Sequence, residues 1–437
     1  MASRALGLLV MCSGALGQIT VTDTRTTVSE SATTTEGTPT GTYLTYTSQM
    51  TNLGTLSDTD STTISSNSTV SQSKVSTTDT RTFLTGGSTS TASGNFSSTT
   101  VTSATATVTN TRPCNNYPEF CNRKYSNITE VSCHNSPFVT ANNLAANQQY
   151  DVTYQLNDGV RFIQAQIQWP TNATEPHFCH TSCDILDAGP ITDWLGTVKD
   201  WVASHPYDVV TILLGNGNYS VPSIYYPYIE STGILDYVYT PPLVPMTLND
   251  WPTLAEMILT GKRVVMFLDY MANQTEYPWL LDEFSQMWET PFDPTDNNFP
   301  CDVQRPPNLA DADAQNRLYL INHNLNIELS LLGTSLLVPA RDELNVTNAV
   351  NGTGSVGLAG ENCLNQWGRA PNFLNVDYYN RGSYAGSVFE AAAQFNNVTY
   401  SRSCCGTTSA ASRLGFDGLS TQTLLSMAAV AVALLAM

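Results

Sequence analysis

The sequence predicts an α/β fold for residues 113–405, and three features of that region indicate it. Strand-like apolar runs recur along it, and residues with helical periodicity follow them. One run, residues 208–214 (DVVTILL), is continuous and β-branched, as buried parallel strands are. The length of the region suits a barrel of the TIM (β/α) type, which has roughly 250 residues. Strand alternating with helix over this length therefore predicts a TIM-type barrel.

The other elements follow in chain order. Three further strands are predicted, at residues 160–169 (VRFIQAQIQW), 263–270 (RVVMFLDY) and 372–379 (NFLNVDYY). Helices are predicted at residues 191–204, 253–259 and 383–395. One face of the first helix forms an apolar stripe, which is typical of a helix packed on a core and consists of Trp194, Val198, Trp201 and Val202.

The chain is acidic and carries few charges. Its 437 residues include 18 Lys and Arg against 37 Asp and Glu, for a net charge of −19, and charged residues make up 13%. A protein that binds nucleic acid needs clustered cations for the phosphates, and so does a patch that binds an anionic leaflet. Composition therefore excludes a surface built mainly for nucleic acid, argues against a polybasic membrane patch, and indicates a globular, extracellular protein.

Residues 1–17 predict an export signal. Arg4 supplies the positive start, residues 5–11 (ALGLLVM) the short apolar core, and residues 15–17 (ALG) a small-x-small cleavage site. Cleavage would leave Gln18 as the first residue. An N-terminal membrane anchor is the alternative, for which the apolar run is too short.

Residues 406–437 predict a signal for attachment of a glycosylphosphatidylinositol (GPI) anchor. Small residues at 409–411 precede a polar spacer and an uncharged apolar tail, residues 424–437 (LLSMAAVAVALLAM). We expect attachment near Ser409. The alternative is a tail-anchored helix, which would need about 20 apolar residues.

Residues 18–112 predict an unfolded stalk. From residue 19 to 112 about every second residue is Ser or Thr, and neither Cys nor Trp occurs. Such a segment buries too little apolar surface to offset the entropy lost on ordering. O-glycosylation would make it a mucin-like stalk, and an unmodified flexible linker is the alternative. N-glycosylation sequons strengthen the secretory interpretation, and they stand at Asn67, Asn95, Asn127, Asn172, Asn218, Asn273, Asn345, Asn351 and Asn397.

Nine cysteines follow residue 17, which is an odd number. In an oxidising compartment most of them should pair, and one is left over. Cys114–Cys121 and Cys179–Cys183 are candidates for local bridges, while the other pairings stay open. A zinc site is a weaker alternative, because no CxxC pair accompanies a correctly spaced pair of histidines.

Polar side chains at the carboxyl ends of barrel strands are catalytic candidates. In this sequence they are His134, Gln166, Asn216, Asp269 and Asp377. His180 is a further candidate, because a bridge between the cysteines on either side of it would clamp its loop. Two histidines on opposite sides of a phosphate can act as general base and general acid near neutral pH. Surface or structural roles are the alternative, and we expect them for His177, His205 and His323.

Four motifs stand in a fixed order: CHNSPF at 133–138, GVRFIQAQIQW at 159–169, CHTSC at 179–183 and DVVTILLGN at 208–216. In order and spacing they resemble the phosphatidylinositol-specific phospholipase C (PI-PLC) X-domain superfamily, and within it the fungal, secreted, PLC-like phosphodiesterases. The resemblance covers residues 114–399. It implies a distorted TIM barrel, in agreement with the fold predicted from the residues.

The resemblance also implies a mechanism with two histidines. His134 corresponds to the general base that takes the proton from the inositol 2-hydroxyl, and His180 to the general acid that protonates the leaving glycerol oxygen. Asp377 resembles the carboxylate that orients His134, with a capping or turn role as its alternative. Asp269 is expected to contact substrate hydroxyls or a cationic head group, and a solvated strand end is its alternative.

Some positions depart from the family pattern. After GVR the family has an acidic residue and then an arginine or a second acidic residue, whereas this chain has Gln164 and Gln166. Glutamines can bind a phosphate oxygen but carry no charge, and losing a cationic donor could cost about 3–4 kcal/mol of transition-state stabilisation. Gly215 and Asn216 stand where calcium-dependent members have a glutamate, so we expect no metal and no cofactor. We expect Asn135 and Asn216 to bind substrate, with a turn role as the alternative for Asn135.

Two functions are left open. The first is a GPI-anchored, cell-surface phosphoric diester hydrolase, a monomer that cleaves a phospholipid or glycolipid phosphodiester. The second is a catalytically decayed barrel that acts as a cell-wall or adhesion protein. The two histidines favour the first, and the glutamines and the acidic surface favour the second. Other hydrolases fit poorly, because neither HxKxxxxD nor GxSxG occurs.

Overall fold

The computed structural model describes residues 25–28, 43–46, 48–52, 112–331 and 334–406, which all fall within one compact unit. The predicted export signal, most of the predicted stalk and the predicted GPI signal lie outside the described residues. None of the helices in the described ranges is long and apolar enough to cross a membrane.

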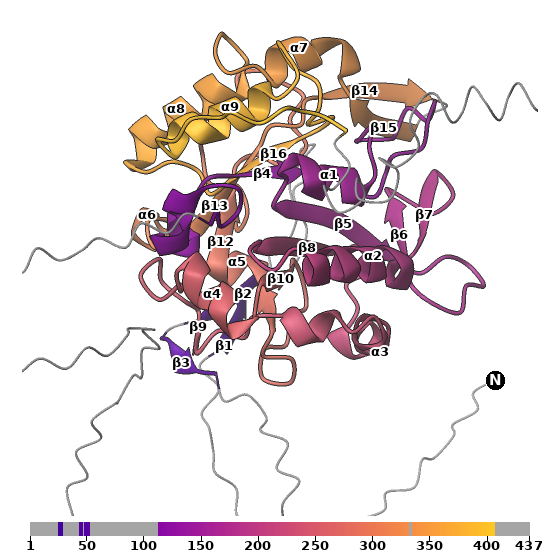
Figure 1. Ribbon diagram of the computed structural model, residues 1–437. Coiled ribbons are helices and arrows are strands. Elements are labelled where there is room, and N and C mark those ends of the chain that lie inside the picture. Colours follow the sequence, from indigo (N-terminus) through magenta and orange to yellow (C-terminus); the bar gives the residue numbers. More distant parts are fainter. Residues whose placement is uncertain (1–24, 29–42, 47, 53–111, 332–333, 407–437) are drawn as a thin grey trace, which may run out of the picture. The chain divides into compact units, whose positions relative to one another are not determined.

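Eight parallel strands form the centre of the fold: β4 (Glu130–Cys133), β5 (Phe162–Gln168), β8 (Val210–Asn216), β10 (Val264–Leu268), β11 (Leu280–Asp282), β12 (Met287–Glu289), β13 (Leu318–Asn322) and β16 (Phe373–Val376). They pair in the order β11, β10, β8, β5, β4, β16, β13, β12. The two edge strands, β11 and β12, are separated along the chain only by α5 (Glu283–Gln286), a helix of about 6 Å. The sheet therefore curls into a barrel with one unpaired seam between β11 and β12, which confirms the predicted distorted TIM barrel (Figure 1).

The two faces of the barrel strands pack into two separate apolar clusters. Successive side chains of a strand point to opposite faces. The odd-numbered residues Ile163 and Ala165 of β5 pack in the outer cluster, against helices that cover the barrel. Phe162 of β5 and Phe267 of β10 belong to the inner cluster. Further along β5 the inward positions are polar, so the barrel interior is apolar at one end and polar at the other.

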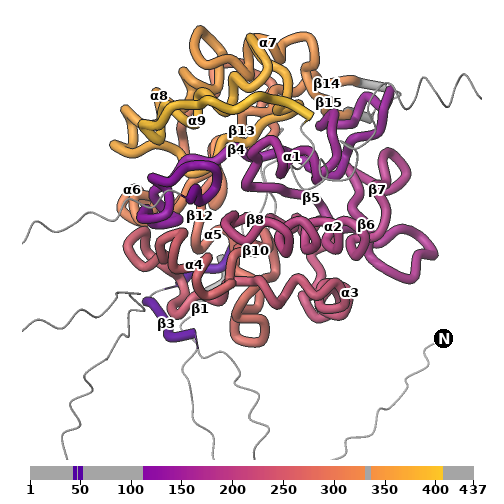
Figure 2. The backbone as a smooth tube through the Cα atoms, viewed as in Figure 1, coloured from indigo at the N-terminus to yellow at the C-terminus, as the bar shows by residue number. Residues whose placement is uncertain are grey.

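The predicted helices are present. They are α2 (Ile191–Ser204), α4 (Leu254–Thr260) and α9 (Ser387–Phe395), and α8 (Val356–Trp367) was not predicted. At the start of α4, Thr253 and Glu256 form a capping box, and Gly261 ends the helix with a φ of 73°. Figures 1 and 2 show α8 and α9 side by side on one side of the barrel, and α2 with α3 (Tyr226–Ser231) on another.

Shorter elements complete the domain. The short helices are α1 (Val152–Asp158), α6 (Asp311–Ala314) and α7 (Leu344–Thr347). The 3-10 helices are η1 (Pro118–Asn122), η2 (Tyr125–Asn127), η3 (Pro222–Ile224), η4 (Ile234–Tyr237) and η5 (Arg341–Glu343). The antiparallel strands are β6 (His177–His180), which pairs with β5, β7 (Leu186–Pro190), which pairs with β6, and the hairpin of β14 (Asn326–Leu331) and β15 (Thr334–Pro339).

The disulfides agree with the predicted local bridges. Cys114 is bonded to Cys121 and Cys179 to Cys183. The sequence left the other pairings open, and in the structure they are Cys301–Cys363 and Cys404–Cys405. Cys133 is the cysteine left over, and it is buried directly before His134.

Part of the predicted stalk differs from the expectation. β1 (Arg25–Val28) pairs with β2 (Tyr43–Tyr46), and β3 (Met50–Thr51) pairs with β9 (Leu243–Val244) of the domain. Tyr43 and Leu44 are only 5% and 6% exposed. These two side chains supply apolar burial that the Ser/Thr-rich composition as a whole does not. Residues 43–46 and 48–52 therefore belong to the folded unit, although they lie in the region expected to be a stalk.

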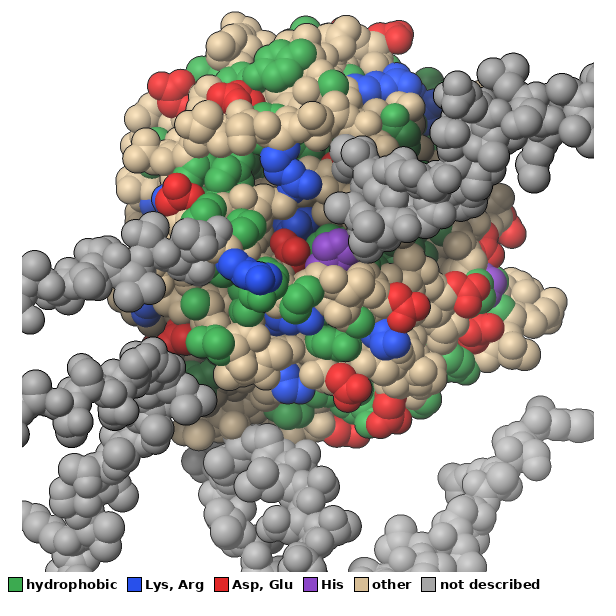
Figure 3. All heavy atoms as spheres, viewed as in Figure 1, with side chains coloured by type: hydrophobic (Ala, Val, Ile, Leu, Met, Phe, Trp, Pro, Cys, Tyr) green, Lys and Arg blue, Asp and Glu red, His purple; other side chains and the backbone are tan. Residues whose placement is uncertain are grey.

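The surface carries the sequons and the excess of acidic groups. Asn127, Asn172, Asn218, Asn345, Asn351 and Asn397 are exposed, and Asn273 is half-buried. On the face shown in Figure 3, acidic side chains gather over α2, α3 and the β6–β7 hairpin.

The inner apolar cluster should dominate the stability of the barrel. Phe162 is fully buried there, with its ring centroid 4.5 Å from that of Phe373. We expect Phe162→Ala to lower the free energy of unfolding by about 3–5 kcal/mol. Leu259→Ala, at a side chain that is 85% exposed, is the matched control and should change it by less than about 0.5 kcal/mol. Guanidinium titrations of both variants measure this, and equal effects would contradict the assignment of the inner core.

Candidate active site

A cavity of about 490 Å³ lies at the carboxyl ends of the barrel strands. Six of the residues predicted from the sequence line it, namely His134, Asn135, Gln164, Gln166, His180 and Asp269. Parallel strands place their carboxyl ends at the same end of a barrel, which explains why residues so distant in sequence meet there. The two predicted catalytic histidines thus share one cavity.

His134 follows β4 and is bound to Asp377, which follows β16. These strands are neighbours in the sheet, and the His134 backbone N–H donates to the Val376 carbonyl at 3.0 Å. The Nδ1 atom of His134 lies 2.8 Å from Oδ1 of Asp377. Because a carboxylate accepts, Nδ1 carries the proton and Nε2 is left as the basic atom. The Asn135 amide nitrogen lies 3.1 Å from Nε2, as expected for a donor facing a lone pair.

Two neighbouring amides hold this pair in place. Asn147 donates to Oδ1 of Asp377 at 2.9 Å, and Gln148 donates to the backbone carbonyls of His134 and Val376 at 2.8 and 3.0 Å. Neither residue was predicted, because they lie in a loop (residues 147–149, NQQ) without periodicity or motif.

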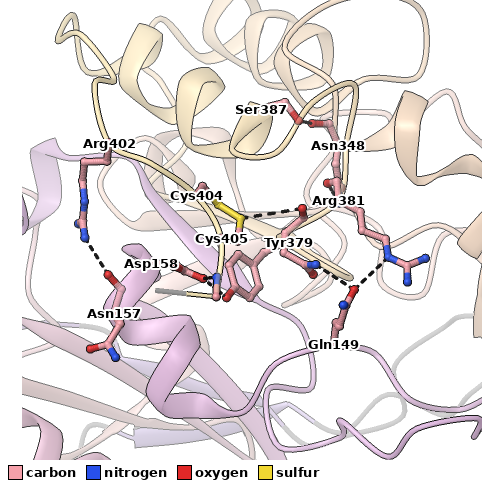
Figure 4. Close-up of a disulfide and its surroundings, with 12 residues drawn as sticks. Gln149, Asn157, Asp158, Asn348, Tyr379, Arg381, Ser387, Arg402, Cys404 and Cys405 are labelled. Carbon is pink, nitrogen blue, oxygen red and sulfur yellow. Dashed lines mark hydrogen bonds between the residues drawn. A yellow bond between two sulfur atoms is a disulfide. The ribbon is translucent and has the colours of Figure 1, made fainter. Parts of the chain in front are cut away.

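The chain after Asp377 is held by the loop that carries the Cys404–Cys405 disulfide, as Figure 4 shows. The Tyr379 hydroxyl donates to Oδ2 of Asp158 at 2.5 Å, and the Gly406 backbone N–H donates to the same oxygen at 2.6 Å. This anchors the segment behind Asp377 to α1 and to the end of the domain.

His180 ends β6 and approaches the cavity from the β6–β7 hairpin. The disulfide between Cys179 and Cys183 closes the loop around it, as predicted. Its Nδ1 lies 3.1 Å from the Thr181 hydroxyl, and its ring meets the Phe138 ring edge-on at 5.2 Å. These contacts leave Nε2 available to the cavity.

The two histidines have oppositely shifted pKa values. Burial alone would lower the pKa of His134, but the charge of Asp377 and its hydrogen bond outweigh burial and raise it. Burial, with a smaller contribution from the nearby His134 charge, lowers the pKa of His180 to about 4. Of the two rings, His134 therefore binds a proton more readily than His180.

Gln164 and Gln166 line the cavity from β5. Gly215 of β8 and Gly217 just after it leave room for this, since a Cβ atom at Gly217 would lie 2.9 Å from the Gln166 side chain and one at Gly215 would lie 3.2 Å from the Gln166 Cα. The Gln166 side-chain oxygen accepts from Gln168 at 3.0 Å, and the Gln164 side-chain oxygen is buried without a partner among the described residues. Gln164 is thus free to bind a substrate.

The sequence reasoning missed a buried cation in the cavity, Arg305. Its guanidinium donates to Glu289 at 2.8 Å and to the Tyr270 hydroxyl at 3.0 Å, and it lies 3.8 Å from Asp269. Burial disfavours the charge, yet these neighbours outweigh it and raise the pKa of Arg305 well above its usual value. The sequence showed neutral glutamines where the family has an acidic residue and an arginine, and the buried cation of this cavity comes instead from the loop after β12.

Several carboxyl groups of the cavity are held towards their neutral forms. Burial raises the pKa of Asp269 to about 6, although Arg305 and two backbone N–H groups oppose the rise. Burial also raises the pKa of Asp293, against the charges of His134 and Arg305, and it raises the pKa of Glu283 well above its usual value. Burial therefore reduces the negative charge that these carboxyl groups bring to the cavity.

Asn216, predicted to bind substrate, is not among the residues that line the cavity. Its amide nitrogen donates to the Ser220 and Tyr270 carbonyls at 2.8 and 3.0 Å, and its oxygen accepts from Ser220 N–H and the Tyr225 hydroxyl at 3.0 and 2.9 Å. The side chain is fully buried, so it fixes the loop after β8.

The cavity offers a poor set of ligands for calcium. Gln164 and Gln166 are neutral, and Glu289 is bound by Arg305. Within the described residues, one group of three His, Cys, Asp or Glu has ligand atoms within 4.8 Å, and it consists of Asp158 with the disulfide-bonded Cys404 and Cys405.

The other histidines lie outside this cavity. His177 pairs with Asp187 at 2.9 Å near the surface, and His205 stacks on Trp201 with ring centroids 3.9 Å apart. His323 is buried against Phe299, which lowers its pKa to about 3. Their placement agrees with the predicted surface and structural roles.

Known proteins resemble this chain in sequence and in fold. The family model PI-PLC X (PI-PLC X 1) matches residues 120–396. An "uncharacterized secreted protein" of Arthroderma benhamiae is 55% identical over 304 residues, which are 69% of this chain and 68% of that protein. The "PI-PLC X domain-containing protein 1" of the same organism is 41% identical over 271 residues, 62% of this chain and 86% of that protein.

Solved structures are more distant. The phosphatidylinositol-specific phospholipase C of Listeria monocytogenes shares 13% identity at a TM-score of 0.43, over 66% of this chain and 97% of that one. An F249X mutant of the Staphylococcus aureus enzyme shares 15% identity at a TM-score of 0.39, over 62% and 93%. The family model covers more than half of the sequence, and this chain therefore belongs to the PI-PLC X domain family.

Proposed function

We propose that the protein is a phosphoric diester hydrolase of the phospholipase C type, which cleaves a phospholipid or glycolipid phosphodiester with two histidines. The observation that carries the proposal is that His134 and His180 line one cavity, with Asp377 bound to the far nitrogen of His134. The names of the PI-PLC relatives indicate the substrate class.

In the proposed reaction, Nε2 of His134 takes the proton from a hydroxyl of the head group as that oxygen attacks phosphorus. The bond from phosphorus to the leaving oxygen breaks, and that oxygen receives a proton from His180. Asp377 keeps Nδ1 of His134 protonated and stabilises the imidazolium that forms. Arg305 and the Gln164 amide are the groups of the cavity wall that offset the charge developing on the phosphate.

The free protein holds its proton on the wrong histidine for this reaction. His134 has a raised pKa and His180 a pKa of about 4, so the form with a neutral His134 and a protonated His180 is a minor one. A bound phosphodiester carries a negative charge next to both rings. Its charge favours a proton on His180, the histidine that has no carboxylate of its own, and so populates the reactive form.

The protein is further proposed to be secreted and held at the cell surface by a GPI anchor attached near Ser409, with residues 18–112 as a glycosylated stalk. The export-signal pattern, the apolar tail and the name of the secreted relative support this. The second candidate function is a decayed barrel in a cell-wall or adhesion protein, which the neutral Gln164 and Gln166 favour.

The roles of the two histidines can be separated by the leaving group. On phosphatidylinositol, His134→Ala and His180→Ala should each lower kcat/KM by about 10²–10⁴-fold, because each removes one proton transfer. On an inositol phosphodiester of 4-nitrophenol, which leaves without a proton, His180→Ala should retain most activity and His134→Ala should not.

The matched control is His177→Ala, at the surface His–Asp pair, which should resemble the wild type on both substrates. If His134→Ala instead kept its activity on the 4-nitrophenol substrate and His180→Ala lost it, the roles of general base and general acid would be exchanged. Equal product from wild type and both cavity variants would support the decayed barrel.

The pH dependence should follow the proton shared by the pair. Below a pH of about 4 both histidines are protonated, no base is left, and kcat/KM should fall. Above the raised pKa of His134 both are neutral, no acid is left, and it should fall again. Asp377→Asn removes the charge that raises the pKa of His134, so the alkaline limb should move to lower pH. Asp187→Asn, at the surface pair, should leave both limbs in place.

Calcium should not be needed. Among the described residues of the cavity, no three acidic groups bring oxygen atoms within 4.8 Å of one another, so we expect activity on phosphatidylinositol to be unchanged by EGTA. Initial rates with and without the chelator, and with calcium restored, measure this. Loss of activity that calcium restores would show that the assignment of Gln164 and Gln166 is wrong.

A further inference from the structure

Two short parts of the Ser/Thr-rich region, residues 43–46 and 48–52, are built into the barrel domain. The Asn52 backbone N–H donates to the Pro242 carbonyl at 2.9 Å, and the Asn52 side chain donates to the Pro278 carbonyl at 3.0 Å. Gln49 donates to Oδ2 of Asp250 at 2.7 Å. Both the backbone and the side chains of the second part are thus fixed to the domain.

Tyr43 packs at the unpaired seam of the barrel. Its ring meets that of Phe284 edge-on at 4.9 Å and that of Tyr270 at 5.7 Å. Phe284 lies in α5, the helix that joins the edge strands β11 and β12, and Tyr270 follows β10. The three rings form an apolar cluster of their own, separate from the two clusters of the barrel.

The Tyr43 hydroxyl ends a chain of hydrogen bonds that leads into the cavity. It lies 3.3 Å from the Tyr270 hydroxyl, in a buried contact. The Tyr270 hydroxyl accepts from Arg305 at 3.0 Å, and Arg305 also binds Glu289. Tyr270, Glu289 and Arg305 line the cavity, whereas Tyr43 stands behind its wall.

We propose that Tyr43 is a positioning residue of the active site: its hydroxyl orients both the Tyr270 hydroxyl and the guanidinium of Arg305. The role rests on the proposed function. Carboxylates lie on one side of the Arg305 guanidinium, and its Nε atom has no hydrogen-bond partner among the described residues. The orientation of the guanidinium therefore depends on the few acceptors around it. The catalytic unit then begins before residue 120, where the family model starts, and a domain cut at that point lacks one of its parts.

The test compares two variants of the full chain on phosphatidylinositol. Tyr43→Phe keeps the ring and removes only the hydroxyl, so the melting temperature should stay close to that of the wild type. We expect kcat to fall about three- to tenfold, the size of one lost hydrogen bond, with KM nearly unchanged, because Arg305 acts on charge that develops during the reaction. Gln49→Ala removes a contact of the same segment remote from the cavity wall, and its kcat should stay within about twofold of the wild type.

A double-mutant cycle shows whether the effect passes through Tyr270. If the two hydroxyls act as one unit, Tyr43→Phe should lower kcat no further when Tyr270 is already Phe. Additive losses, or a Tyr43→Phe variant as active as the wild type, overturn the positioning role. If the wild-type chain cleaves no phosphodiester, both the proposed function and the role of Tyr43 are overturned. If the wild type is active and Tyr43→Phe is equally active, only the role of Tyr43 is overturned.

Discussion

One buried guanidinium joins the two sides of the barrel where backbone pairing is missing. Arg305 binds Glu289 at the end of β12 on one side of the seam, and Tyr270 after β10 on the other. Arginine suits this place because its planar fork makes several directed hydrogen bonds and its rim packs on aromatic rings. Breaking such a buried pair leaves an uncompensated charge, which costs about 3–5 kcal/mol. The closure of the barrel and the charge of the cavity thus depend on the same side chain.

The seam is tied to the catalytic strand by a row of polar side chains inside the barrel. Ser132 of β4 donates to Asn375 of β16 at 2.8 Å, Asn375 donates to Asn322 of β13 at 3.1 Å, and Asn322 donates to Glu289 of β12 at 3.3 Å. Amides suit such a row because each can donate and accept at once. The row begins two residues before His134 and ends at the partner of Arg305, so it sets the positions of both relative to each other.

The electrostatics of the cavity fit the proposed anionic substrate better than the net charge of the protein indicates. The carboxyl groups that face the cavity are buried, and burial raises the pKa values of Asp269, Asp293 and Glu283. The site therefore carries less negative charge than its composition indicates. The same burial separates the pKa values of the two histidines, since one of them has a carboxylate partner and the other has none. Net charge alone is a poor guide to what such a cavity binds.

The sequence by itself determined the elements with local patterns: the continuous strands β8 and β10, the amphipathic α2, the short-range disulfides and, through motifs, the two histidines and Asp377. Such features depend on residues that are close together along the chain, and there the periodicity of apolar residues and the spacing of motifs indicate which side chains are buried. Tertiary structure alone decided the rest. His134 meets Asp377 across 243 residues and Tyr43 meets Tyr270 across 227, and the loops that carry Arg305 and Asn147 have no periodicity. Asn216 shows the converse. Its position at a strand end predicted a contact with substrate, but in the folded protein its side chain makes its hydrogen bonds to Ser220, Tyr225 and Tyr270. Contacts of this kind exist only once the barrel has curled, which is why no local pattern could reveal them.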